Sequence, residues 1–275
     1  MHKIGIIGYG NMGQAIAHRL NEYQVFVFDK DKSKLTGAGH IHTVASLEEV
    51  LANDTEVLVL AVKPQDFSEI IEQIKHKVKE HLVISVAAGI TTEYIENKLG
   101  KARVVRVMPN LPAKIGKAMS CLCAGKFVDE PGLHLAEKIF KQLGQTMIIK
   151  ENLMSAATAI SGSGPAYVCR FIENNGNELT GISRGKEEIF LEEFLKAAES
   201  CGFNKKQAEL LVISTYQGTV EFLRQSGISA AELRMQVTSK AGTTEAALNV
   251  LSSGGSLLKA VKAAALRAEE LSKRE

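Results

Sequence analysis

Near its start the chain carries the sequence KIGIIGYGNMG at positions 3–13. The first five residues of this stretch are a short apolar run, which predicts a buried strand. Residues 11–20 carry a helical pattern. Gly8, Gly10 and Gly13 fit the spacing G-x-G-x-x-G and lie where the strand passes into the helix. The stretch therefore predicts a strand–turn–helix unit with a glycine-rich turn.

Each of the three glycines has a physical role in such a unit. Gly8 makes the tight turn, Gly10 lets a pyrophosphate approach the backbone, and Gly13 lets helix and strand pack closely. The free N–H groups and the positive dipole at the helix N-terminus favour phosphate. The pattern predicts a dinucleotide site, and the alternative is a glycine-rich turn that binds no ligand.

Asp29 follows the second predicted strand, about 20 residues after the first glycine of the motif. A carboxylate at this position accepts hydrogen bonds from the adenosine ribose and disfavours a 2′-phosphate, which favours NADH. Lys30, Lys32 and Lys34 follow at once and could neutralise such a phosphate. The choice between NADH and NADPH therefore stays open at this point.

The first half of the chain alternates between strand and helix patterns. Further apolar runs predict strands at residues 25–28, 57–62, 82–87, 104–108 and 147–149, and helices at 67–78 and 131–143. Ser46 and Glu49 fit a capping box, which predicts another helix start. This alternation predicts right-handed crossovers and a parallel sheet, an α/β fold of the Rossmann type.

After about residue 150 strand patterns nearly vanish. Helical patterns cover residues 153–173, 187–200, 206–225, 230–237, 244–251 and 256–272. We predict a dinucleotide-binding domain over residues 1–150 and an all-helical domain over residues 151–275.

Composition excludes several classes of protein. Hydrophobic residues are 45% and charged residues 23%, the net charge is +2 with both signs interleaved, and aromatic residues are 5% with no Trp. These values are typical of a globular protein and speak against nucleic-acid binding. No apolar run reaches the ~20 residues that span a membrane. The N-terminus lacks the pattern of a secretory leader, so we expect a cytoplasmic protein.

The chain has four cysteines, at positions 121, 123, 169 and 201, and seven histidines. Without a secretory leader, free thiols are the expectation. Cys121 and Cys123 share one face of a strand but lack two further ligands at a familiar spacing, and the histidines form no ligand pair. We predict buried structural cysteines and no metal site.

Two stretches of the helical half are unusual. Residues 160–167 read ISGSGPAY, and glycine and proline at this density are costly inside a helix. A close helix crossing that requires small side chains would explain them. Residues 236–245 read QVTSKAGTTE and place the hydroxyls of Ser239, Thr243 and Thr244 beside free N–H groups at a helix start. This is either an anion site for a substrate carboxylate or an ordinary capped helix.

Taken together, these stretches resemble the pyrroline-5-carboxylate reductase family from end to end. The resemblance is carried by GYGNMG (8–13), AVKPQ (61–65), AAGI (87–90), RVMPNLP (106–112), SGSGPAY (161–167) and VTSKAGTT (237–244). The last two motifs are much more specific than a dinucleotide fingerprint, and their order along the chain also matches.

The resemblance implies an activity and its cofactor. Members of this family use NADPH or NADH to reduce the ring imine of L-1-pyrroline-5-carboxylate to L-proline, the last step of proline synthesis. By similarity, Gly10, Asn11 and Met12 approach the pyrophosphate. The strand-end segments Val62-Lys63-Pro64 and Ala88-Gly89 flank the nicotinamide side, beyond the carboxyl ends of the strands.

The resemblance also implies a substrate site and an assembly. Ser239, Gly242 and Thr243 hold the substrate carboxylate, and Thr244, the one catalytic residue, reaches the imine nitrogen. The imine reacts when protonated, so water supplies the proton and the protein supplies proximity and a dry pocket. The helical domain builds a homodimer by interleaving with its partner, and dimers often assemble into decamers.

The chain departs from the family pattern at two places. The carboxylate loop, usually Ser-Pro-Gly-Gly, is SKAG at residues 239–242, and Ala in place of Gly disfavours a positive φ. Lys240 could add a charge near the carboxylate or point to solvent. Residues 174–186 hold several helix breakers, which predicts a loop insertion before a helix that resumes near Glu187.

Three other functions are alternatives to this one. A hydroxyacid dehydrogenase of the same architecture needs a lysine on the first helix of the second domain, and residues 155–170 contain none. A cofactor-binding paralogue without activity is suggested by the altered loop at 239–242. A reductase of a related cyclic imine, such as the six-membered homologue, would use the same site.

Overall fold

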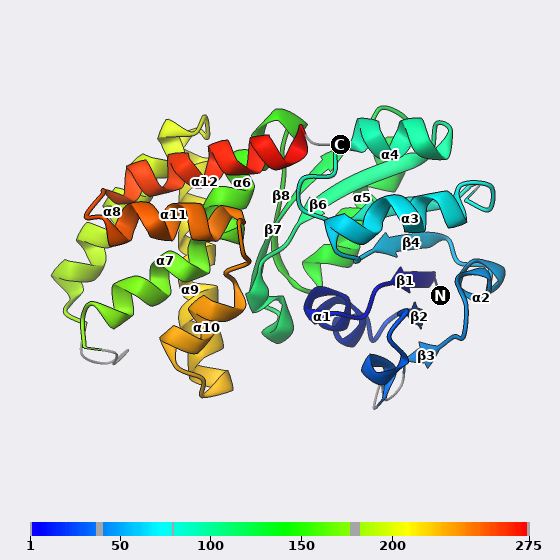
Figure 1. The fold of residues 1–275 in the computed structure, drawn as a ribbon, viewed down its shortest axis with the longest axis horizontal. Helices are drawn as coiled ribbons and strands as arrows, with labels where there is room; N and C mark the ends of the chain where they lie inside the picture. Colours follow the sequence, from blue (N-terminus) through cyan, green and yellow to red (C-terminus); the bar gives the residue numbers. More distant parts are fainter. Residues whose placement is uncertain (1, 37–40, 79, 177–181, 274–275) are drawn as a thin grey trace.

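The computed structural model describes residues 2–36, 41–78, 80–176 and 182–273. Figure 1 shows a sheet covered by helices beside a group of helices that belongs to the second half of the chain. The sheet ends at Ile148, and in the described residues every element that follows it is helical. This is the predicted arrangement of a Rossmann-type unit followed by an all-helical part.

The sheet has eight strands in the order β3-β2-β1-β4-β5-β6-β7-β8. They are β1 (Lys3–Ile7), β2 (Gln24–Phe28), β3 (His42–Thr43), β4 (Val57–Leu60), β5 (Leu82–Ser85), β6 (Arg103–Met108), β7 (Ala118–Ala124) and β8 (Gly144–Ile148). The six strands from β3 to β6 run parallel. Strands β4 and β5 end two residues before the predicted ends, because the chain leaves the sheet there to form the strand-end loops.

The prediction of a wholly parallel sheet is wrong at one edge. Strand β7 pairs with β6 in the antiparallel direction, and β8 runs parallel to β7. The cause is the short connection between β6 and β7, a 3₁₀ turn at Leu111–Ile115 that ends at Gly116 with φ +72°. A connection this short can join only antiparallel neighbours.

Helices cover both faces of the sheet. They are α1 (Asn11–Arg19), α2 (Leu47–Ala52), α3 (Pro64–Ile74), α4 (Thr92–Leu99) and α5 (Glu130–Lys141), of which α4 was not predicted. One core joins α1 and α5 to the sheet through residues such as Ile16 and Phe140. The other joins α3 and α4 to the opposite face through Phe67 and Ile95. The sheet is therefore covered on two sides, which leaves the carboxyl ends of its strands as the place for a ligand.

The helical part consists of α6 (Met154–Ala157), α7 (Gly164–Glu173), α8 (Arg184–Ser200), α9 (Lys205–Ser226), α10 (Ala230–Gln236), α11 (Thr243–Ser252) and α12 (Leu257–Ser272). The helix predicted over 153–173 is interrupted by a π-helical turn at Thr158–Gly162. After this turn, a Cβ atom at Gly164 would lie 2.6 Å from Thr215 Cγ2 of α9. Gly164 therefore permits the close helix crossing that small side chains suggested.

The interruption predicted after α7 is confirmed by the described residues. Helix α7 ends at Glu173, and α8 begins at Arg184, three residues before the predicted start. Part of the predicted loop, residues 177–181, lies outside the described residues.

All four cysteines are free, as predicted, and three of them are buried. Cys121 and Cys123 lie on one face of β7, in the core shared with the helices. Burial raises the pKa of the Cys121 thiol to about 12, so it stays protonated and inert. Among the described residues, no helix is long and apolar enough to cross a membrane, and no three potential ligand side chains gather in a metal-binding cluster.

Candidate functional site

The three motif glycines meet different requirements in the structure. Gly8 has φ +99°, and a Cβ there would lie 2.7 Å from the carbonyl oxygen of Ala61. A Cβ at Gly13 would overlap the carbonyl oxygen of Gly8. A Cβ at Gly10 would meet nothing within 4 Å. Packing within the protein therefore requires glycine at positions 8 and 13, whereas at Gly10 the open space is a cradle that fits a pyrophosphate.

A cavity of about 340 Å³ adjoins this loop. It lies beyond the carboxyl ends of β1, β2 and β4 and is walled by α3. The predicted cofactor residues among its lining are Gly8, Gly10, Asp29, Lys30, Val62 and Lys63. Its position and its lining fit the adenosine half of a dinucleotide.

Asp29 anchors the glycine loop as well as lining the cavity. Its carboxylate is 7% exposed. Oδ2 accepts a hydrogen bond from the Tyr9 backbone N–H at 2.7 Å, and Oδ1 accepts one from Asp31 N–H at 2.8 Å. Lys34 Nζ lies 3.3 Å from Oδ1. Backbone bonds therefore fix the negative charge at the edge of the cavity.

Asp66, which sequence reasoning missed, lines the same cavity from the first turn of α3. Lys30 Nζ donates to Asp66 Oδ1 at 2.6 Å. This hydrogen bond holds the pKa of Lys30 above its usual value. The sequence signal was an acidic residue in the first turn of a helix that follows a strand-end motif.

The other predicted cofactor residues lie outside the lining of this cavity. Asn11 and Met12 begin α1, and Lys114 Nζ donates to Asn11 Oδ1 at 3.1 Å. Pro64 is the first residue of α3. The segment Ala88-Gly89 follows β5, and Gly89 has φ +84° at a loop that contacts the end of α12.

The two helical-domain motifs meet in a cluster of three hydroxyl groups. Ser163 Oγ lies 3.0 Å from Thr243 Oγ1, and Thr244 Oγ1 donates to Ser163 Oγ at 3.0 Å. Ser163 is fully buried, and Thr244 is 4% exposed. The sequence did not single out Ser163 within its glycine-rich stretch. Its link to the threonines is seen only in the contact with Thr244, which lies 81 residues further along the chain.

Asn110 connects this region to the sheet. Its Nδ2 donates to the carbonyl oxygen of Ser161 at 3.2 Å, and its Oδ1 accepts from Met119 N–H at 3.0 Å. Asn110 itself is 2% exposed and follows the end of β6. The strand-end motif and the SGSGPAY motif therefore form one buried junction.

The loop at residues 239–242 leads into α11. Gly242 is the N-cap of α11, and no side chain caps the first turn, so its N–H groups can bind an anion. Ala241 has φ +55°, the conformation that the sequence analysis expected to be unfavourable for alanine. Arg267 Nε donates to the Ala241 carbonyl at 2.8 Å, and Glu245 Oε2 accepts from Ala241 N–H at 2.8 Å. Lys240 is exposed.

Ala241→Gly is expected to raise the free energy of unfolding by about 0.5–1 kcal/mol, because glycine adopts this φ without strain. Urea unfolding of the variant and the unaltered protein, with the same m-value for both, measures the difference in the free energy of unfolding. Ala246→Gly, the same substitution inside α11, is the control and is expected to lower stability by about 1 kcal/mol. A loss of stability at position 241 would show that the left-handed backbone carries no strain there.

Comparison with known proteins adds two family matches. Residues 179–271 match the family model for pyrroline-5-carboxylate reductase dimerisation. Residues 3–89 match the model for NADP oxidoreductase, coenzyme F420-dependent. The two matches fall on the helical part and on the sheet, respectively.

Relatives extend the match over nearly the whole chain. Pyrroline-5-carboxylate reductase 2 of Bacillus subtilis (strain 168) is 32% identical over 91% of this chain and 87% of its own length. The Synechocystis pyrroline-5-carboxylate reductase is 32% identical over 99% of both. The solved structure of a pyrroline-5-carboxylate reductase from Coxiella burnetii is 34% identical, with TM-score 0.63 over 98% of each chain. A Plasmodium falciparum pyrroline carboxylate reductase, solved with NADP bound, is 26% identical with TM-score 0.63. The chain belongs to the pyrroline-5-carboxylate reductase family.

Proposed function

We propose that this protein catalyses the NAD(P)H-dependent reduction of L-1-pyrroline-5-carboxylate to L-proline, the last step of proline biosynthesis. The observation that carries the proposal is the hydroxyl cluster of Ser163, Thr243 and Thr244, which lies at the uncapped start of α11. The names of the relatives support the same reaction. The open cradle at Gly10 supports a nicotinamide dinucleotide as its cofactor.

The cofactor, when bound, supplies a hydride from nicotinamide C4 to the imine carbon. Gly10, Asn11 and Met12 would hold its pyrophosphate by backbone N–H groups at the start of α1, and Gly8 and Gly13 would shape the turn that presents them. Asp29 and Lys30 would bind at the adenosine ribose. The segment Val62-Lys63-Pro64 would lead from the adenosine cavity, which Val62 and Lys63 line, toward the nicotinamide, and Ala88-Gly89 would flank the nicotinamide side.

The substrate is proposed to bind at the start of α11. Ser239, Gly242 and Thr243 would hold its carboxylate through hydroxyl and backbone N–H groups. Thr244 is the proposed catalytic residue, with its hydroxyl at the imine nitrogen. Ser163 accepts from Thr244 in the described structure, so it orients that hydroxyl. The protein thus supplies orientation, and water supplies the proton.

A steady-state assay with L-1-pyrroline-5-carboxylate tests the proposal, with NADH and NADPH run side by side. The expected result is loss of the reduced-nicotinamide absorbance with saturable dependence on the imine. Folded protein that binds a cofactor but oxidises neither NADH nor NADPH in the presence of the imine would contradict the proposal. The remaining functions would then be reduction of another cyclic imine or cofactor binding without catalysis.

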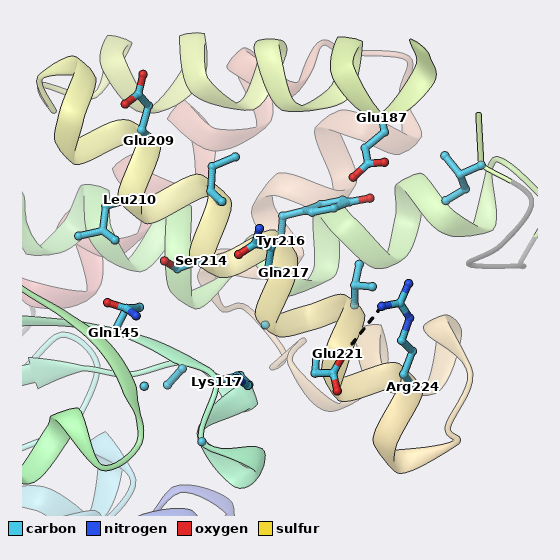
Figure 2. A pocket seen from close by; sticks show the side chains of 17 residues that line it. Lys117, Gln145, Glu187, Glu209, Leu210, Ser214, Tyr216, Gln217, Glu221 and Arg224 are labelled. Atoms are coloured by element: carbon cyan, nitrogen blue, oxygen red, sulfur yellow. Dashed lines mark ion pairs between the residues drawn. The ribbon is translucent and has the colours of Figure 1, made fainter. Parts of the chain in front are cut away.

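We further propose a homodimer in which helical domains interleave. The support is a groove of about 1080 Å³ between α9 and the start of β7 and β8. Figure 2 shows Leu210, Tyr216 and Glu221 of α9 on one wall, and Lys117 and Gln145 opposite. Helix α9 lies wholly within the part that matches the dimerisation model. A second copy of this chain is therefore the proposed occupant of the groove.

Leu210→Glu is expected to weaken self-association about 100-fold, because it would bury a carboxylate against the partner. Light scattering during size-exclusion chromatography measures the mass, and the same experiment distinguishes a dimer from a decamer. Lys138→Glu, which places a carboxylate on the exposed side of α5, is the control and should leave the mass unchanged. An unchanged mass for Leu210→Glu would contradict the proposed use of the groove.

The proposed domains are residues 1–150 for the cofactor and residues 151–275 for the substrate and the dimer. The change from sheet to helices between Ile148 and Glu151 supports this boundary. We propose a cytoplasmic location, which four free cysteines support, since thiols persist in reducing compartments.

A further inference from the structure

We propose that Asp66 determines the cofactor preference of this protein by holding Lys30, so that the site selects the 2′-hydroxyl of NADH over the 2′-phosphate of NADPH. The inference rests on the proposed function, since it concerns the same cofactor cavity. Asp66 belongs neither to the glycine motif nor to the acidic position at the end of β2, which is Asp29.

Two of the lysines that line the cavity are already paired with carboxylates. Lys30 and Lys34 are the two lysines that follow β2 and line it. Lys30 bonds to Asp66 at 2.6 Å, and Lys34 lies 3.3 Å from Asp29. Of the three lysines predicted to neutralise a 2′-phosphate, the two that line the cavity are therefore both engaged by carboxylates.

A 2′-phosphate would meet two costs at this site. It would have to displace Asp66 from Lys30, and it would bring its negative charge toward Asp29, which backbone N–H groups hold in place. A neutral 2′-hydroxyl meets neither cost and can donate to a carboxylate. The pairing therefore favours NADH.

Asp66 is the removable part of this arrangement. Its side chain is 28% exposed and lies in the first turn of α3. Asp29, in contrast, also holds the glycine loop, so its replacement disturbs the site for either cofactor. A change at Asp66 frees Lys30 without loosening that loop.

Asp66→Asn is expected to tighten NADPH binding about tenfold, because a freed Lys30 gains a charge-assisted bond to phosphate. NADH binding should change little. Titration calorimetry of the full-length protein with NADH and with NADPH measures both dissociation constants without turnover. Lys30→Met should abolish the gain when combined with Asp66→Asn, which shows that Asp66 acts through Lys30.

Glu72→Gln is the matched control. It removes the same charge from α3, where Glu72 pairs with Lys75 and Lys98 away from the cavity, and should leave both constants unchanged. Equal changes for NADH and NADPH in Asp66→Asn, or a gain that persists in the double variant, would overturn the inference. Absence of turnover in a protein that shows the expected binding shift would contradict the proposed reaction alone.

Discussion

Thr244→Val is expected to lower kcat about 100-fold, the effect of losing one hydrogen-bond partner placed at a reacting group. Valine has nearly the shape of threonine, so the buried site keeps its packing, and Ser163 keeps Thr243 as a partner. Cofactor affinity should not change, because the hydroxyl cluster belongs to the substrate site. Steady-state kinetics and titration calorimetry with NADH separate the two quantities.

Two further variants sharpen this test. Ser163→Ala should also lower kcat, since it removes the acceptor that orients the Thr244 hydroxyl. Thr219→Val is the control, because the Thr219 hydroxyl is buried but bonds only to the carbonyl of Thr215 in its own helix. If Thr244→Val turns over like the control, Thr244 has no catalytic role.

Gly13→Ala is expected to weaken cofactor binding more than 100-fold and to lower the free energy of unfolding by about 1–3 kcal/mol. The added methyl group would overlap the Gly8 carbonyl, so α1 would have to move away from the loop that follows β1. Urea unfolding and calorimetry with NADH and NADPH measure the two effects.

Gly10→Ala is the matched variant with the same added methyl group. None of the described residues lies within 4 Å of that position, so stability should stay the same. Affinity should still fall strongly, because the methyl group would occupy the cradle proposed for the pyrophosphate. A Gly10→Ala protein that binds the cofactor normally would refute that placement.

Local sequence pattern predicted most of the elements but not their limits. The apolar runs of β1 and β4 and the period of α3 follow from a few adjacent residues each. The pattern continued through Ala61 and Val62, where the chain already leaves the sheet. An apolar run records which side chains avoid water, and Ala61 and Val62 in the strand-end loop are partly buried too.

The direction of β7 and the break before α7 could not be predicted in this way. The first depends on a short turn that ends at Gly116, and the second on Gly164 at a crossing with α9. Both are decided by partners distant in the sequence. The same holds for Ser163, which looked like part of a glycine-rich helix until Thr243 and Thr244 were found beside it.

The amino-acid sequence alone determined the Rossmann-type order of elements, the glycine turn and the family motifs, because each depends on residues close together in the chain. Tertiary structure decided which of these residues act together. It engaged Asp29 with the Tyr9 backbone, paired Lys30 with Asp66 and brought Ser163 to Thr244. Charges and hydroxyl groups act over a few ångströms, and only folding brings such groups within that distance across many residues of chain.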